Sequence, residues 1–272
     1  MSKVIFITGA SRGFGKIWTE AFLKRGDKVV ATTRDITQLN SLTKQYSDNF
    51  LAVELDVNNR AADFAAVKKA KEHFGRIDVL INNAGYGLFG AIEETSEQEA
   101  REQIEVNVFG LLWLTQAIIP VMREQGGGHI INLSSVLGLV STPTLGLYNA
   151  SKYAVEGISE TLAAEVKQFG IKVSLVEPNA YATDWGGLSA IHTTPMPEYD
   201  EMKATFRSHL TADFFGDPLA TTEAILKLVD AENPPLHLLL GKKAYPWVRE
   251  VYQQKYAEWD AWNDVAVAAH GK

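Results

Sequence analysis

Short apolar runs alternate with longer stretches of helical periodicity along almost the whole chain. The run "KVIFITG" at 3–9 is followed by a helical pattern at 14–24, and this order repeats several times. A strand, a helix and a second strand in succession form the unit that joins neighbouring parallel strands. The runs are almost continuously apolar, as strands are when helices cover both faces of a sheet. We therefore expect an α/β fold built on a doubly wound parallel sheet.

About seven strands flanked by helices are expected in this Rossmann-type sheet. No internal repeat and no low-complexity linker interrupts the pattern, so residues 1–272 are predicted to form a single domain. The predicted strands are 3–9, 27–33, 50–56, 77–83, 128–135, 171–178 and 236–240, and the predicted helices are 14–24, 36–46, 60–74, 97–124 and 147–169.

Two segments depart from this alternation. Residues 184–216 mix glycine, proline, histidine and aromatic side chains between the sixth strand and the next helix. Long irregular insertions in a compact domain are often functional, and the apolar content here favours a lid over a substrate site. From about residue 242 a C-terminal helical extension is expected. Its tryptophans Trp247, Trp259 and Trp262 are interpreted as packing or subunit-contact residues.

The composition disfavours several classes of function. The chain has 33 acidic and 26 basic residues, and the formal charge of −7 disfavours a nucleic acid or an anionic membrane as partner. The absence of cysteine removes disulfides, thiol nucleophiles and thiolate metal sites, and the six histidines show no metal-ligand spacing. The N-terminal apolar run is too short for a signal peptide core or a membrane span, and no other run approaches a span. The sequence therefore predicts a cytoplasmic protein without a metal site.

A glycine-rich turn, "TGASRGFGK", follows the first strand and opens the first helix. Gly9, Gly13 and Gly15 form the pattern GxxxGxG. A P-loop ending at Gly15 would need glycine where Ala10 stands and serine or threonine where Ile17 stands. Glycines let backbone N–H groups approach a phosphate at a helix N-terminus. A tight turn without a ligand is the alternative, but the position after the first strand of a doubly wound sheet favours a dinucleotide.

The end of the second strand should select the cofactor. Asp35 lies where an acidic residue could hold a ribose hydroxyl and select NAD. We favour a structural role for it, because Asp35 to Gln38 has the form of a helix capping box. Arg34 beside the last strand residue, Thr33, and Arg12 in the glycine turn would together suit a 2′-phosphate, since guanidinium binds phosphate through two hydrogen bonds. NADP(H) is therefore favoured, with NAD(H) as the alternative.

Five features occur along the chain in a fixed order. They are "TGASRGFG", "NNAG", Asn107, "NLSS" and "YNASK". In this order and spacing they resemble the short-chain dehydrogenase/reductase family, and the resemblance covers about residues 3–183. Ser135 precedes Tyr148 by 13 residues and follows Asn107 by 28, both similar to the family's spacings. "NNAGYG" and "ATTRD" are most similar to its hydroxysteroid and retinol dehydrogenase-like branch.

The resemblance implies a catalytic set of Asn107, Ser135, Tyr148 and Lys152. Tyr148 would be the general acid or base, Ser135 would hold the substrate oxygen, and Asn107 would hold a water linked to Lys152. Positions four residues apart share a helix face, so Lys152 is expected to lie near the phenol and lower its pKa. Asn107 could instead only kink its helix, and Ser134 is the rival for the serine role.

The resemblance also implies cofactor and substrate contacts. The family usually has glycine after Pro178, and here Asn179 is expected either to extend toward the substrate or to adopt a positive φ. The implied cofactor residues are Gly9, Ser11, Arg12, Gly13, Phe14, Gly15, Thr33, Arg34, Asp56, Val57, Asn83, Ala84, Gly85, Tyr148, Lys152, Pro178 and Thr183, and the expected substrate residues are Leu137, Leu145, Asn179, Tyr181 and Trp185.

These features predict an NADP(H)-dependent oxidoreductase, a ketoreductase or carbonyl reductase. It would interconvert a small apolar ketone or aldehyde with an alcohol, and the family often forms homodimers or homotetramers. One alternative is a non-catalytic dinucleotide-binding sensor, which would be expected to have a broken catalytic set. Another is a sugar-nucleotide epimerase or dehydratase relative, which usually carries GxxGxxG and a larger C-terminal domain.

Overall fold

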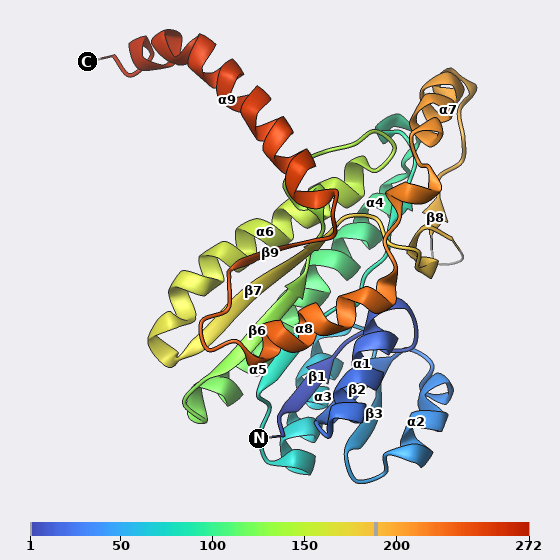
Figure 1. The fold of residues 1–272 in the computed structure, drawn as a ribbon, viewed down its shortest axis with the longest axis vertical. Helices are drawn as coiled ribbons and strands as arrows, with labels where there is room; N and C mark the ends of the chain where they lie inside the picture. The colour runs from blue at the N-terminus through green and yellow to red at the C-terminus, as the bar shows by residue number, and fades with distance from the viewer. Residues whose placement is uncertain (1, 188–189, 272) are drawn as a thin grey trace.

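The computed structural model describes residues 2–187 and 190–271 and contains one large sheet of parallel strands (Figure 1). Its strands are β1 (Val4–Ile7), β2 (Lys28–Thr33), β3 (Phe50–Glu54), β4 (Val79–Asn82), β6 (Gly128–Leu133), β7 (Ile171–Pro178) and β9 (His237–Leu240). They lie in the order β3-β2-β1-β4-β6-β7-β9, and every neighbouring pair is parallel. The predicted seven-stranded, doubly wound sheet is confirmed.

Helices cover both faces of the sheet (Figure 1). On one face, Trp18 and Ile225 belong to one hydrophobic core, and on the other Val67, Leu114 and Leu162 belong to a second. The helices are α1 (Gly13–Arg25), α2 (Asn40–Gln45), α3 (Arg60–Phe74), α4 (Glu97–Ile104), α5 (Gly110–Glu124), α6 (Gly146–Val166), α7 (Asp200–Ser208), α8 (Thr221–Asp230) and α9 (Ala244–Ala268).

Two predicted helices are interrupted for local reasons. The helix expected at 36–46 begins as a 3₁₀ turn, Ile36–Leu39, because Asp35 accepts the Thr37 backbone N–H at 3.0 Å and so caps the turn. The helix expected at 97–124 contains a π-helical segment, Glu105–Phe109, between α4 and α5. Segments of this kind often occur at functional sites, and Asn107 lies at its centre.

The strand order reverses between β1 and β4. β2 and β3 lie on one side of β1, whereas β4, β6 and β7 lie on the other. The loops that follow β1 and β4 therefore run to opposite sides, which leaves a crevice at the carboxyl ends of the strands where such sheets bind ligands. The glycine turn and the "NNAG" segment both lie at this edge.

The segment Glu97–Glu124 is long and apolar enough to cross a membrane by length and composition, with a mean hydropathy of 1.6 over 18 residues. The expectation that no run approaches a span was wrong on that measure. The segment forms α4, the π turn and α5, and Leu114 and Ile118 are buried in a core of the domain. The apolar residues of this segment thus contribute to a hydrophobic core of the folded domain.

The predicted lid, 184–216, holds a short strand and a helix, with Leu188 and Ser189 outside the described residues. β8 (Ile191–His192) pairs with β5 (Leu88–Phe89), and Lys203 of α7 forms an ion pair with the buried carboxylate of Glu94. Burial would raise the pKa of Glu94, but hydrogen bonds from Lys203 and from the backbone of Met196 and Ala91 lower it to about 2. This segment is therefore held to the body by strand pairing and by charge.

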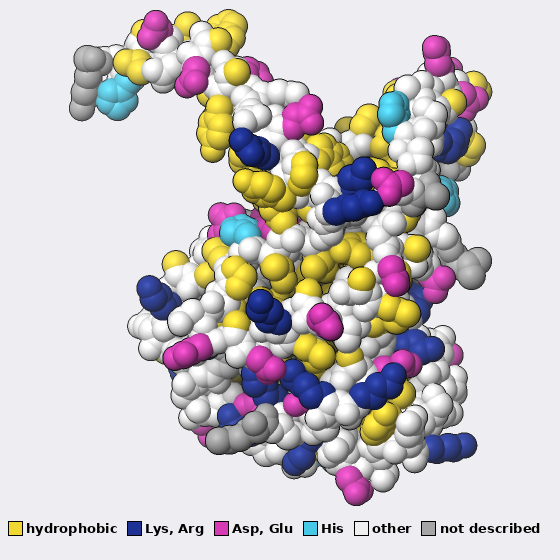
Figure 2. All heavy atoms as spheres, in the orientation of Figure 1, with side chains coloured by type: hydrophobic (Ala, Val, Ile, Leu, Met, Phe, Trp, Pro, Cys, Tyr) yellow, Lys and Arg dark blue, Asp and Glu magenta, His cyan; other side chains and the backbone are white. Residues whose placement is uncertain are grey.

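Helix α9 extends away from the body of the molecule (Figure 1). Its first turns carry Trp247 and Val251, which pack against a small core that includes Tyr148. Farther along, Trp259 and Trp262 are exposed, and Figure 2 shows apolar side chains along this helix. The extension predicted from about residue 242 thus has an anchored half and a solvent-exposed half.

Candidate active site

Ser135, Tyr148 and Lys152 lie together at the carboxyl end of β6. Ser135 is the second residue after the strand, and Tyr148 and Lys152 lie one turn apart on the buried face of α6. The Lys152 ammonium is 5.6 Å from the centre of the Tyr148 ring and donates a hydrogen bond to the Leu133 carbonyl at 2.7 Å. The structure therefore brings together three of the four residues expected to be catalytic.

The pKa of Tyr148 differs in direction from the sequence expectation. The side chain is buried, and burial raises its pKa above that of a free phenol, while a hydrogen bond with Ser135 lowers it in part. Burial disfavours the charged form of the phenol and is the largest cause of this shift. Tyr148 is accordingly a neutral phenol that can donate a proton.

Burial acts on Lys152 as well. It lowers the pKa of the ammonium to about 8, and the negative charge of Glu156 acts in the opposite direction. Because that value is near physiological pH, Lys152 can change its charge within the range in which enzymes operate.

Asn107 is buried in the π turn and is bonded on several sides. Its Nδ2 donates to the Tyr86 carbonyl and to Ser151 Oγ, both at 3.1 Å, and its Oδ1 accepts the Tyr86 N–H. It thus fixes the loop after β4 to the helix that carries Tyr148. These contacts do not join it directly to Lys152, so the water-holding role stays a prediction.

The two adjacent serines have different partners. Ser134 Oγ donates to Glu156 Oε1, so its hydroxyl is turned away from the phenol. Ser135 Oγ accepts the Leu137 N–H at 3.1 Å, lies 3.5 Å from the Pro178 carbonyl and forms a hydrogen bond with Tyr148. The geometry favours Ser135 for the serine role, as the spacing did.

The glycine turn forms a close cradle at the start of α1. Gly9 and Gly13 have positive φ, and a Cβ on Gly15 would lie 2.3 Å from the Gly9 carbonyl oxygen. The Asn83 amide crosses the turn, donating to the carbonyls of Thr8 and Gly9 at 2.8 and 3.1 Å. No side chain among the described residues caps the first turn of α1. A phosphate group fits this donor set.

The residues expected to bind the adenosine end surround the same crevice. Arg12 and Arg34 are exposed, so their guanidinium groups can reach a ligand. Asp35 is engaged in its own turn, where hydrogen bonds with Thr37 lower the pKa of its carboxyl group. The structural role favoured from the capping pattern is therefore confirmed.

The loops after β3 and β4 and the segment after β7 complete the crevice. Val57 is buried against Gly110, and Asp56 accepts the Asn58 N–H at 3.0 Å. Gly85 lies against Asn107, and a Cβ on Gly13 would lie 4.0 Å from Thr183. The remaining expected cofactor residues, Ser11, Phe14, Thr33, Ala84 and Pro178, belong to the same turns and strand ends.

Apolar side chains lie beside the phenol of Tyr148. Leu137 and Leu145 share its buried core, and the Trp185 ring is 4.8 Å from the Tyr148 ring. Phe89 packs on Trp185 at 5.3 Å. The sequence did not indicate Phe89, because its strand is only two residues long. These residues would give a substrate an apolar and aromatic surface.

Two of the expected substrate residues face elsewhere. Thr144 is the one non-glycine residue with positive φ in the described part of the chain, so the positive-φ alternative for Asn179 was wrong. The Asn179 side chain donates to the Ala180 carbonyl and lies close against Gly241. Tyr181 packs against Phe14 at 5.2 Å, which places it beside the glycine turn. Local packing after β7 thus turns both away from the apolar surface.

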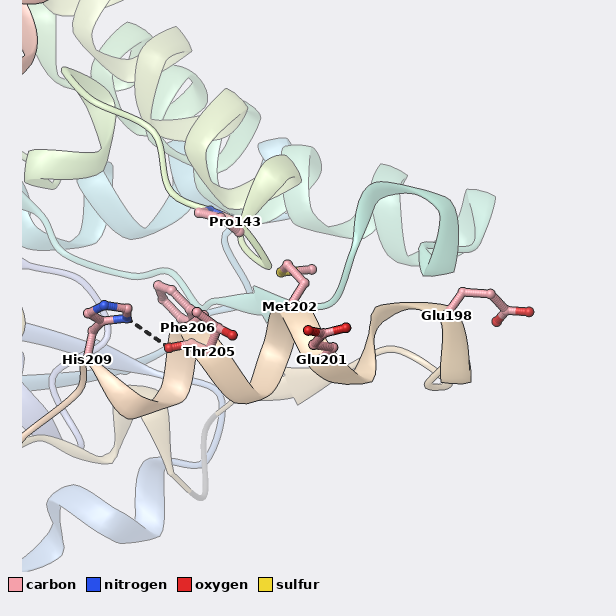
Figure 3. Close-up of a pocket in the computed structure, with 7 residues that line it drawn as sticks. All are labelled: Pro143, Glu198, Glu201, Met202, Thr205, Phe206 and His209. Atoms are coloured by element: carbon pink, nitrogen blue, oxygen red, sulfur yellow. Dashed lines mark hydrogen bonds between the residues drawn. The ribbon is translucent and has the colours of Figure 1, made fainter.

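A hollow of about 560 Å³ lies between α7 and the loop that carries Pro143 (Figure 3). Met202 and Phe206 point from α7 toward Pro143 in this view. It does not include Tyr148, so we interpret it as a feature of the lid and not as the reaction centre. Its lining residues are Pro143, Glu198, Glu201, Met202, Thr205, Phe206 and His209.

A family model described as short chain dehydrogenase matches residues 3–189, which is more than half of the chain. The chain belongs to the short-chain dehydrogenase family. It is therefore an oxidoreductase of this family, and structural neighbours in the family hold nicotinamide nucleotides.

Curated relatives agree with this membership. Oxidoreductase BOA17 of Botryotinia fuckeliana is 36% identical over 273 residues, covering 99% of this chain and 100% of that protein. A 3-ketodihydrosphingosine reductase of Bacteroides thetaiotaomicron is 37% identical over 246 residues, with 88% of each chain covered.

Solved short-chain dehydrogenases have the same fold. One from Streptomyces avermitilis superposes with a TM-score of 0.91 at 38% identity and 98% coverage of both chains. A Burkholderia phymatum protein in complex with NAD gives a TM-score of 0.80 at 27% identity, covering 94% of this chain and 95% of that one. A Burkholderia cenocepacia protein in complex with NADP gives 0.76 at 27% identity, covering 96% and 97%.

Proposed function

We propose that this short-chain dehydrogenase is an NADP(H)-dependent carbonyl reductase that interconverts a ketone or aldehyde with an alcohol. The observation that carries the proposal is the joint placement of Ser135, Tyr148 and Lys152 beside an apolar surface and the glycine cradle. A non-catalytic sensor would have no need for a buried phenol held between a hydroxyl and an ammonium.

The side chains have complementary tasks. When bound, the nicotinamide supplies a hydride to the carbonyl carbon or accepts one from the alcohol carbon. Ser135 Oγ would donate a hydrogen bond to the substrate oxygen, and the neutral Tyr148 hydroxyl would give that oxygen its proton. The Lys152 ammonium would favour the phenolate left behind, because an opposite charge nearby stabilises a charged group.

The cofactor cradle supports NADP(H) over NAD(H). The acidic group that could hold a ribose 2′-hydroxyl, Asp35, is used as a cap, whereas Arg12 and Arg34 are exposed at the adenosine end. Two guanidinium groups suit a 2′-phosphate. The Gly9–Gly15 cradle would hold the pyrophosphate, and Thr183 would lie at the nicotinamide end.

The substrate is proposed to be small and apolar around its carbonyl. Leu137, Leu145, Trp185 and Phe89 surround the phenol with hydrocarbon and aromatic surface. The name of the Bacteroides relative, 3-ketodihydrosphingosine reductase, supports a ketone next to an aliphatic chain. The similarity of "NNAGYG" and "ATTRD" to hydroxysteroid and retinol dehydrogenases is in keeping with such a substrate.

We also propose a homo-oligomer in the cytoplasm. The apolar window within Glu97–Glu124 is only 44% buried in the single chain, which leaves apolar helix surface available to a second copy.

A panel of carbonyls and alcohols, assayed with each of NADPH, NADH, NADP⁺ and NAD⁺, tests the proposal. We expect NADPH oxidation with apolar ketones or aldehydes and a weaker response with NADH. NADPH binding without turnover on the whole panel would favour the sensor, and a clear NADH preference would contradict the arginine argument. Turnover of nucleotide sugars alone would favour an epimerase or dehydratase relative.

A further inference from the structure

A cluster of ionisable side chains lies one helical turn beyond the catalytic lysine. Glu156 of α6 and Glu177 of β7 are buried, and His237 at the start of β9 is partly exposed. His237 Nδ1 is 2.7 Å from Glu177 Oε1 and 3.6 Å from Glu156 Oε2, and its Nε2 is 3.8 Å from the exposed carboxylate of Glu160. The reaction proposed above uses none of these groups.

Glu156 is linked to the residue beside Ser135 by a hydrogen bond and to Lys152 by its charge. Its Oε1 accepts the hydroxyl of Ser134, which stands between Leu133 and Ser135. The Leu133 carbonyl accepts a hydrogen bond from Lys152. Lys152 lies four residues before Glu156 on the same helix face. A single carboxyl group thus joins the serine-bearing end of β6 to the lysine-bearing turn of α6.

Each of the two buried carboxyl groups has one oxygen without a hydrogen-bond partner. These oxygens are Glu156 Oε2 and Glu177 Oε2, which are buried and have no hydrogen-bond partner among the described residues. Burial, followed by the charge of Glu177, raises the pKa of Glu156 to about 8, and burial raises the pKa of Glu177 to about 7. Glu156 is therefore a group whose charge changes in the same alkaline range as that of Lys152.

Charged and titratable groups on each neighbouring element lie around the carboxyl group of Glu156. Lys152 and Glu160 lie on α6, Glu177 on β7 and His237 on β9. Tyr252 of α9 also lies within reach of the charges of Glu156 and Glu160. Among these groups Lys152 is the buried cation, so a change in the charge of Glu156 acts on it most directly.

The same side chains have the chemistry of a divalent-cation site. Ligand atoms of Glu156, Glu160 and His237 lie within 4.8 Å of one another. However, Glu156 Oε1 is engaged by Ser134, and His237 Nδ1 is engaged by Glu177. These bonds favour a hydrogen-bonded cluster over a cation site. The assays of the Glu156 variants contain EDTA, so that a bound ion does not contribute to the result.

We propose that Glu156 is a positioning residue of the active site: it holds Ser134, and with it Ser135, in place, and its negative charge supports the ammonium of Lys152. This inference rests on the proposed carbonyl reduction. It assigns to the Glu156, Glu177 and His237 cluster the task of setting the pH at which the catalytic lysine loses its charge.

Four variants separate the two tasks. Glu156→Gln keeps an acceptor for Ser134 but removes the carboxylate charge that acts on Lys152, whereas Ser134→Ala removes the hydrogen bond and keeps the charge. Glu156→Leu removes both. Glu160→Gln is the matched control, because this exposed carboxylate lies one turn farther along the same helix and faces the same histidine.

The readout is kcat for carbonyl reduction with NADPH between pH 6 and 10. We expect Glu156→Gln to move the alkaline fall of kcat down by about one pH unit, because Lys152 loses a nearby anion. Ser134→Ala should lower kcat about 3- to 10-fold without moving this fall, and Glu156→Leu should do both. Glu160→Gln should match the wild type.

A second readout needs no turnover. Competitive acetylation of amines, followed peptide by peptide by mass spectrometry, gives the pH at which Lys152 becomes reactive, and this midpoint should fall in Glu156→Gln but not in Glu160→Gln. An unchanged midpoint, or Glu156 variants that lose thermal stability while keeping the wild-type pH profile, would overturn the inference. If the wild type reduces no carbonyl, the proposed function fails and the acetylation midpoint alone decides the role of Glu156.

Discussion

Burial is the largest cause of the pKa shifts of both Tyr148 and Lys152. Burial raises the pKa of the phenol and lowers the pKa of the ammonium to about 8, so both shifts favour the neutral forms. The sequence could predict the pairing from helix periodicity. It could not predict the direction of the shift for Tyr148, because that depends on burial by side chains such as Trp185, which comes from another segment of the chain.

The rate of carbonyl reduction should fall as the pH rises through about 8. A lysine is charged below its pKa, so the support that Lys152 gives to the developing phenolate is present at neutral pH and is lost in the alkaline range. The measurement is kcat with saturating NADPH from pH 6 to 10. A rate that stays constant well above pH 8 would show that the charge of Lys152 does not matter.

Arg12→Ala and Arg34→Ala should each raise the KM for NADPH while leaving the KM for NADH nearly unchanged. Loss of one charge-assisted hydrogen bond to a phosphate corresponds to about a 10- to 100-fold effect. Lys16→Ala is the matched control, since Lys16 is an exposed cation on the same helix as the glycine turn. Equal effects on both cofactors would place the arginines away from the 2′-phosphate.

At the scale of elements, periodicity identified the strands and most helices, whereas contacts between distant segments lay beyond it. The π turn at Asn107 depends on hydrogen bonds to Tyr86 and Ser151, which lie 21 and 44 residues away. Likewise, the lid is held by Lys203 on Glu94, a separation of 109 residues. Neither partner is marked by a local pattern.

Gly15→Ala should disrupt the cofactor cradle. The added Cβ would lie 2.3 Å from the Gly9 carbonyl oxygen, so the turn or the helix must shift. We expect loss of NADPH binding by calorimetry together with a lower Tm. Gly157→Ala is the control within α6, where a Cβ meets nothing within 4 Å, and it should stabilise the protein by about 0.5–1 kcal/mol. Full NADPH affinity in Gly15→Ala would contradict the close approach.

Across the whole molecule, the sheet order follows from the alternation of strands and helices and the handedness of their connections, so the fold class could be predicted from the sequence. The direction in which α9 leaves the body of the molecule could not be predicted from the sequence. Its apolar residues have no strong periodic face that would indicate where the helix leaves the body, and only its first turns pack against the core around Tyr148.

Removal of residues 258–272 should leave the Tm within about 2 °C of the full chain and leave kcat unchanged, because Trp259 and Trp262 are exposed and lie beyond the packed part of α9. Removal of the chain after Gly241 should instead destabilise the protein strongly, since Trp247 and Val251 are then lost from the core. The measurement is thermal unfolding of both truncated chains. A large loss of stability in the shorter truncation would show that the exposed half of α9 is needed, as it would be if it formed a contact between copies.

The most direct test of the proposed reaction is the variant Tyr148→Phe with NADPH and the best carbonyl substrate from the panel. Removal of the hydroxyl takes away the proton donor and leaves the cofactor cradle intact, so NADPH should bind with unchanged affinity while kcat falls by at least about 100-fold. Wild-type turnover in the cofactor-bound variant would contradict the mechanism.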